Sequence, residues 1–113
     1  MADQLPVPTN IRLRRLQEAR ARGTHTRLEW EVLLAIFGGK CVRCGAPRCE
    51  KDHIVPLYQG GSDAIGNLQP MCALCNTFKG PDATDWRDKA YPRWREHFDE
   101  VFALLGTRKG ETA

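Results

Sequence analysis

Four cysteines in two pairs of identical spacing are the residues of this chain that predict chemistry most directly. The pairs are Cys41-Val-Arg-Cys44 and Cys72-Ala-Leu-Cys75. A two-residue spacer lets both sulfurs of a pair reach one ion, and four thiolates bind a tetrahedral Zn²⁺ at about 2.3 Å. We therefore expect these four side chains to hold a structural zinc that fixes both ends of the segment 45–71.

That segment is longer than the roughly 15–20 residues found in common zinc ribbons, so it should contain folded structure of its own. A metal-free thiol cluster or a redox pair is the alternative interpretation of the same cysteines. The five cysteines are an odd number, which argues against a closed disulfide framework. The fifth, Cys49, is expected to be a buried small apolar residue.

A second group of residues has the types needed for hydrolysis. Asp52 and His53 are adjacent, and Asn76 directly follows the last cysteine. A neutral imidazole can act as a general base near physiological pH. A carboxylate and an amide oxygen are hard donors that suit Mg²⁺ or Mn²⁺. Taken alone, a histidine beside an aspartate is more often an ordinary surface or core residue.

The elements that must position these residues are short. Thr26-Arg-Leu-Glu29 is a capping box that predicts a helix over 28–37, and Gly38-Gly39 ends it. Two short antiparallel strands are expected at 50–54 and 55–58, where β-prone residues are interrupted by Pro56.

Two further helices complete the pattern around the cysteines, and a third precedes them. One is predicted over 73–79, ended by Gly80, and one over 92–105, whose aromatic residues recur at helical spacing and should lie in the core. An arginine-rich helix is predicted over 11–21, after a disordered lead at 1–9. Asp63, in a Gly-Gly-Ser-Asp sequence, is expected to form a turn rather than bind a ligand.

Positive charge is concentrated near the N-terminus, although the formal net charge is only +3. Residues 10–27 contain a single acid against Arg12, Arg14, Arg15, Arg20, Arg22 and Arg27. Such a cluster suits a phosphate backbone, and a solvated helix face explains it equally well. Lys79, one helical turn after Asn76, and Arg43 in the first cysteine pair are further candidate phosphate contacts, with simple surface exposure as the alternative.

The order of these motifs resembles that of a known family. The motifs are Asp52-His-Ile-Val-Pro56, Gly60-Gly-Ser-Asp63 and Asn67-Leu-Gln-Pro-Met-Cys-Ala-Leu-Cys-Asn-Thr-Phe-Lys-Gly80. From about residue 24 to 80 the chain resembles the HNH endonucleases of the ββα-metal fold. It is most similar to the small zinc-stapled members found in phage and bacterial genomes.

The resemblance implies a role for each matching residue. His53 would be the general base that deprotonates water, and Asn67 would support the loop and hold that histidine in orientation. Asp52 and Asn76 would bind one catalytic divalent ion. Because position 76 is asparagine instead of histidine, the site would be an HNN variant that favours Mg²⁺ or Mn²⁺ and binds them weakly.

The predicted fold class is α+β. A ββα-metal hairpin and helix centred on 50–80 would be stapled by a Zn(Cys)₄ site and flanked by helices. The expected organisation is a basic N-terminal arm at 1–23, a nuclease domain at 24–106 and a tail at 107–113.

The expected function is metal-dependent hydrolysis of DNA phosphodiester bonds. DNA would be contacted mostly along its backbone, through Lys79, Arg43, Arg12, Arg14 and Arg15. The alternatives are a zinc-stabilised DNA-binding or phage-packaging module without cleavage activity, and an interaction protein that docks through its C-terminal helix. A larger packaging or restriction protein is a possible partner under each of these interpretations. The sequence does not predict the oligomeric state. The polar N-terminus and the lack of a long apolar run predict a cytoplasmic protein, in a bacterium or a phage-infected host, without membrane insertion.

Overall fold

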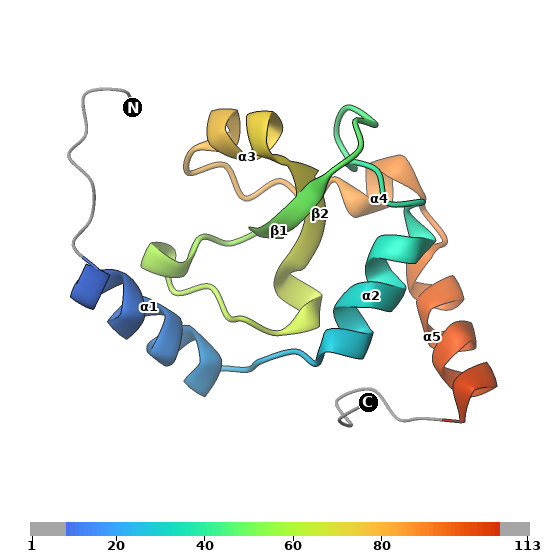
Figure 1. The fold of residues 1–113 in the computed structure, drawn as a ribbon, viewed down its shortest axis with the longest axis horizontal. Helices are drawn as coiled ribbons and strands as arrows, with labels where there is room; N and C mark the ends of the chain where they lie inside the picture. Colours follow the sequence, from blue (N-terminus) through green and yellow to red (C-terminus); the bar gives the residue numbers. More distant parts are fainter. Residues whose placement is uncertain (1–8, 107–113) are drawn as a thin grey trace.

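An antiparallel hairpin of two strands lies at the centre of the structure (Figure 1). The computed structural model describes residues 9–106. Strand β1 (Cys49–His53) pairs with β2 (Leu68–Cys72), so that Cys49 lies opposite Cys72 and His53 lies opposite Leu68. Every residue of β2 is buried, whereas β1 has exposed residues, so β2 is the more deeply buried of the two strands. The α+β fold with a two-stranded hairpin is confirmed.

The second strand does not lie where the sequence pattern predicts it. The segment 55–58 was the predicted partner of β1, but it begins a loop that contains a 3₁₀ turn, η1 (Leu57–Gln59). That prediction is wrong, because β1 pairs with β2 instead. The true partner, β2, contains Pro70. A sheet of two strands has only edge strands, and a proline is tolerated there.

Helices α2 (Arg27–Ile36) and α5 (Trp94–Leu105) pack side by side and cover one side of the hairpin (Figure 1). The capping box at the start of α2 is present. The Thr26 hydroxyl accepts a hydrogen bond from the Glu29 backbone N–H, and the Glu29 carboxylate accepts one from the Thr26 backbone N–H. Six buried residues form the main apolar core: Val32, Leu33, Leu68, Trp94, Phe98 and Phe102. The predicted aromatic stripe of the last helix is therefore core.

Helix α3 (Ala73–Lys79) follows β2 directly and ends at Gly80, as predicted. A short helix, α4 (Arg87–Ala90), has no counterpart in the prediction. Its residue Arg87 is 1% exposed, and the side chain donates hydrogen bonds to the carbonyls of Leu68 and Gly66. This buried guanidinium ties the C-terminal part of the chain to the hairpin.

Helix α1 (Thr9–Ala21) carries the arginine-rich segment and packs against the loop that joins the two strands (Figure 1). Arg22 donates to the carbonyl of Gly61 at 2.9 Å, and Ala19 is fully buried. The predicted lead at 1–9 lies outside the described residues except for Thr9, which begins α1, and the predicted tail at 107–113 lies outside them too. Within residues 9–106, no helix combines the length and apolar character needed to cross a membrane.

Candidate active site and metal centre

The four paired cysteines meet at one point. The sulfur atoms of Cys41, Cys44, Cys72 and Cys75 all lie within 4.8 Å of one another. The Cys44 and Cys72 sulfurs are 3.7 Å apart. A tetrahedral zinc with bonds of about 2.3 Å places its sulfur ligands about 3.8 Å apart. The cluster can therefore hold a structural zinc.

Backbone hydrogen bonds fasten the two cysteine turns to the hairpin. The Val42 amide donates to the carbonyl of Pro70 in β2 at 3.0 Å, and the Gly45 amide closes the first turn on the Cys41 carbonyl at 2.9 Å. The Cys75 amide points at the sulfur of Cys72, 3.5 Å away. A metal at this cluster would thus fix the register of β2 and the start of α3.

The thiols differ in their tendency to ionise. Burial opposes ionisation of Cys41, but the amides of Cys72, Cys44 and Arg43 outweigh it and lower the pKa of this thiol to about 6. Burial raises the pKa of the Cys49 thiol to about 11, and the charges of the neighbouring cysteines act in the same direction. Cys49 is not one of the four cysteines whose sulfur atoms converge.

Asp52 lies on the face of β1 that is turned toward α3. Its carboxylate is buried and accepts a hydrogen bond from Gln69, its cross-strand neighbour, at 2.9 Å. The other carboxylate oxygen lies 3.3 Å from the ammonium of Lys79. Gln69 is itself held by the Trp86 amide at 2.9 Å. The position of this carboxylate is thus set by β2 and α3 together.

Lys79 turns its ammonium inward instead of presenting it to a phosphate. Its side chain is 5% exposed, and the nitrogen donates to the carbonyls of His53 at 2.8 Å and Ile54 at 3.0 Å. The sequence pattern placed Lys79 at the DNA backbone. In the structure the ammonium instead holds the end of β1 against α3.

Asn76, in the middle of α3, faces the same side of β1. Its side-chain nitrogen donates to the carboxylate of Glu50 at 2.7 Å. Glu50 precedes Asp52 by two residues, so both side chains leave the strand on one face. An amide that donates through its nitrogen presents its oxygen to any other partner.

His53, the last residue of β1, is held by a different partner. Its Nε2 lies 2.9 Å from a carboxylate oxygen of Asp63, and its side chain is 22% exposed. Burial would raise the pKa of Asp63, but the hydrogen bond from His53 and the charges of His25 and His53 lower it. An ionised carboxylate can only accept, so Nε2 donates, and the neutral ring carries its lone pair on Nδ1.

Asn67 closes the loop between the two strands. Its side-chain oxygen accepts the Val55 amide at 2.9 Å, and its nitrogen donates to the carbonyls of Val55 and Ser62. The backbone at Gly61 passes so close that an added Cβ would lie 1.8 Å from the Val55 carbonyl oxygen. This loop therefore has little freedom beside His53.

The remaining predicted contacts lie on the surface. Arg12 and Arg14 are exposed on α1, and Arg15 lies over the ring of Tyr58 at 5.9 Å. Arg43, at the tip of the first cysteine turn, is exposed and lies over the ring of Trp86 at 5.6 Å.

The structure reveals three site neighbours that the sequence pattern did not assign. Glu50 could have been found from the two-residue period of a strand that contains Asp52. Asp63 and His25 carry no such signal, because their roles come from the contact of Asp63 with His53 at the end of β1 and from their own contact across 38 residues.

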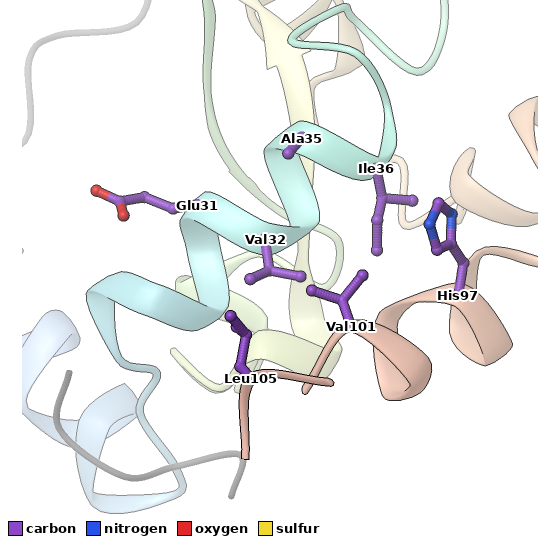
Figure 2. A pocket seen from close by; sticks show the side chains of 7 residues that line it. All are labelled: Glu31, Val32, Ala35, Ile36, His97, Val101 and Leu105. Carbon is purple, nitrogen blue, oxygen red and sulfur yellow. The ribbon is translucent and has the colours of Figure 1, made fainter. Parts of the chain in front are cut away.

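A separate apolar groove lies between α2 and α5 (Figure 2). It has a volume of about 360 Å³, with Val32, Ile36 and Val101 in its floor and Glu31 and His97 among its other lining residues. It contains none of the site residues described above.

Residues 41–82 match the family model of the HNH endonucleases. The match runs from the first cysteine of the metal cluster to just beyond α3, and it confirms the resemblance inferred from the motifs. A search of curated proteins finds none that matches the chain.

Proposed function

We propose that this protein is a metal-dependent endonuclease that hydrolyses DNA phosphodiester bonds with His53 as the general base. The match of residues 41–82 to the HNH endonucleases supports a nuclease. The observation that carries the assignment of the base is the position of His53 at the end of β1. Its side chain is partly exposed, and in the part of the chain that the structure describes only one of its ring nitrogens has a protein partner. The other nitrogen accepts the proton of the attacking water.

Asp52 and Asn76 are the residues that would hold the catalytic ion. The Asp52 carboxylate accepts a hydrogen bond from Gln69 and forms an ion pair with Lys79. A carboxylate has roughly four lone-pair positions, so it keeps oxygen capacity for an ion. The Asn76 amide offers its oxygen because Glu50 takes its nitrogen. Oxygen donors of this kind fit Mg²⁺ or Mn²⁺ better than zinc.

When bound, such an ion polarises the scissile phosphate and stabilises the leaving oxygen. The chain supplies the remaining functions. The Lys79 ammonium already neutralises part of the Asp52 charge, so we expect weak ion binding. Asn67 keeps the loop beside His53 in shape, and a zinc at the cysteine cluster fixes the hairpin to α3.

DNA contacts in this proposal run along the phosphate backbone. The exposed Arg12 and Arg14 and the half-buried Arg15 lie on α1, which packs against the loop between the strands, and Arg43 lies near α3. Backbone contacts position a duplex without reading its sequence, so we expect little sequence discrimination. In this arrangement 1–23 acts as a DNA-binding arm on the nuclease domain at 24–106.

A plasmid assay tests the proposal. Supercoiled plasmid is incubated with the wild type, His53→Ala and the control His97→Ala, each with Mg²⁺, Mn²⁺ or EDTA. His97 is an exposed histidine on α5, outside the site. The wild type and the control should give nicked or linear plasmid only with metal, and His53→Ala should lose at least about 100-fold in rate.

Equal cleavage by wild type and His53→Ala, or no metal-dependent product from either, would overturn the proposal. Retarded migration of DNA without any product would instead favour the zinc-stabilised binding module.

A further inference from the structure

Asp63 is the most connected polar residue beside the proposed base. Its side chain is 7% exposed, and one carboxylate oxygen lies 2.9 Å from Nε2 of His53. The other oxygen accepts a hydrogen bond from the Thr24 hydroxyl at 3.3 Å and lies 3.7 Å from Nε of Arg20. A residue that only formed a turn would not need partners from three separate segments.

The main chain of Asp63 is fixed by the same N-terminal segment. Its amide donates to the carbonyl of Gly23 at 3.0 Å and, more weakly, to that of Ala19 at 3.4 Å. Its own carbonyl accepts a hydrogen bond from Nδ1 of His25 at 2.7 Å. With both main chain and carboxylate held, the side chain has one orientation to offer His53.

We infer that Asp63 is a positioning residue for His53, which rests on the proposed endonuclease function. Its carboxylate accepts a hydrogen bond from Nε2–H, which keeps the proton of the neutral ring on Nε2 and leaves Nδ1 as the basic atom. Thr24, His25 and Arg20 hold Asp63 in turn. The end of α1 and the turn after it therefore belong to the active site, although they precede the segment 41–82 that matches the HNH family.

The variant Asp63→Asn keeps the shape of the side chain and removes its charge. Thr24 and Arg20 face the other oxygen position and favour the amide oxygen there, so the amide nitrogen turns toward His53 and donates to Nε2, which becomes the acceptor. The ring proton moves to Nδ1, where it blocks proton transfer from water. We expect kcat on a short DNA duplex to fall by about 10- to 1,000-fold while KM stays within about two-fold.

The tautomer is measured directly by ¹⁵N NMR of histidine-labelled protein without catalytic metal, at a pH where the ring is neutral. The wild type should show His53 with its proton on Nε2, and Asp63→Asn should move population to the Nδ1 form. Glu96→Gln, an exposed change on α5, serves as the matched control and should alter neither the spectrum nor kcat. Zinc content and thermal melting verify that each variant is folded.

Two results overturn the inference. One is a wild-type His53 with its proton on Nδ1, a measurement that needs no variant to fold. The other is a folded Asp63→Asn protein with the kcat of the wild type. Failure of the proposed function looks different, because the wild type itself then gives no metal-dependent cleavage while the tautomer of His53 can still be read.

Discussion

Glu50 and Asn76 lie 26 residues apart in the chain and face each other across the interface of β1 and α3, with Nδ2 of the amide 2.7 Å from the carboxylate. The contact fixes which end of the amide is presented to the proposed ion. Glu50 orients the Asn76 side chain in the same way that Asp63 orients the His53 side chain. In each pair a carboxylate from another segment decides which atom of a two-ended side chain is left for chemistry.

Replacing Glu50 with glutamine should weaken binding of the catalytic ion. A glutamine can hydrogen-bond either end of the Asn76 amide, so the oxygen is no longer selected. We expect Mn²⁺ affinity, measured by titration calorimetry, to fall by about 10-fold or more, as is typical for lost outer-shell partners of a metal site. Glu31→Gln, on the exposed side of α2, is the control and should bind Mn²⁺ like the wild type.

Loss of one cluster thiol should unfold the hairpin rather than only slow catalysis. The first cysteine turn is hydrogen-bonded to Pro70, and the second pair begins α3, so zinc binding at this site contributes to folding. Metal analysis should return one zinc for each wild-type chain and none for Cys41→Ser, which should also lose its thermal transition. Cys49→Ser should keep its zinc, and a zinc-free but fully folded Cys41→Ser protein would refute this assignment.

A methyl group at position 61 should destabilise the loop that carries Asp63. The added Cβ would lie 1.8 Å from the Val55 carbonyl oxygen, so the backbone has to move. We expect Gly61→Ala to lower the unfolding free energy by at least about 2 kcal/mol in urea denaturation. Gly66→Ala is the matched control, because nothing lies within 4 Å of its added Cβ. Similar losses for both variants would show that the close approach is not the cause.

The ion pair between Asp85 and Arg87 should make part of the stability pH-dependent. Burial would raise the pKa of Asp85, but hydrogen bonds and charge from Arg87 lower it below the usual value of 3.8. A carboxyl whose pKa is depressed by folding stabilises the protein above its unfolded pKa of about 3.9, and the benefit is lost as pH falls through the lower folded value. Urea denaturation of wild type and Asp85→Asn should therefore differ at neutral pH and converge in acid. A difference that stayed constant down to acid pH would contradict this account.

Features set by neighbouring residues could be predicted from the sequence. The capping box of α2, the end of α3 at Gly80 and the convergence of the cysteine pairs all depend on local spacing. Strand β2 could not be placed, because Leu68-Gln-Pro has the composition of a connection and becomes a strand only through pairing with β1. Helix α4 could not be predicted for a similar reason, since its Arg87 is fixed by carbonyls about 20 residues away.

The candidate site shows the same division. The types of Asp52, His53 and Asn76 could be recognised by motif, but the partners that orient them could not. Asp63 is tied to residues of α1 and the following turn that lie 38 or more residues earlier. Lys79 was assigned to the surface because helical spacing says nothing about the strand carbonyls that its ammonium meets.

The hydrogen bonds of Lys79 connect the end of α3 directly to the end of β1. The ammonium bridges the last turn of α3 to the main chain at His53 and Ile54. A displacement of α3, whether caused by an emptied cysteine cluster or by a duplex pressing on the helix, would be transmitted to the imidazole without passing through any flexible segment. The hairpin end and the helix should therefore move together or not at all.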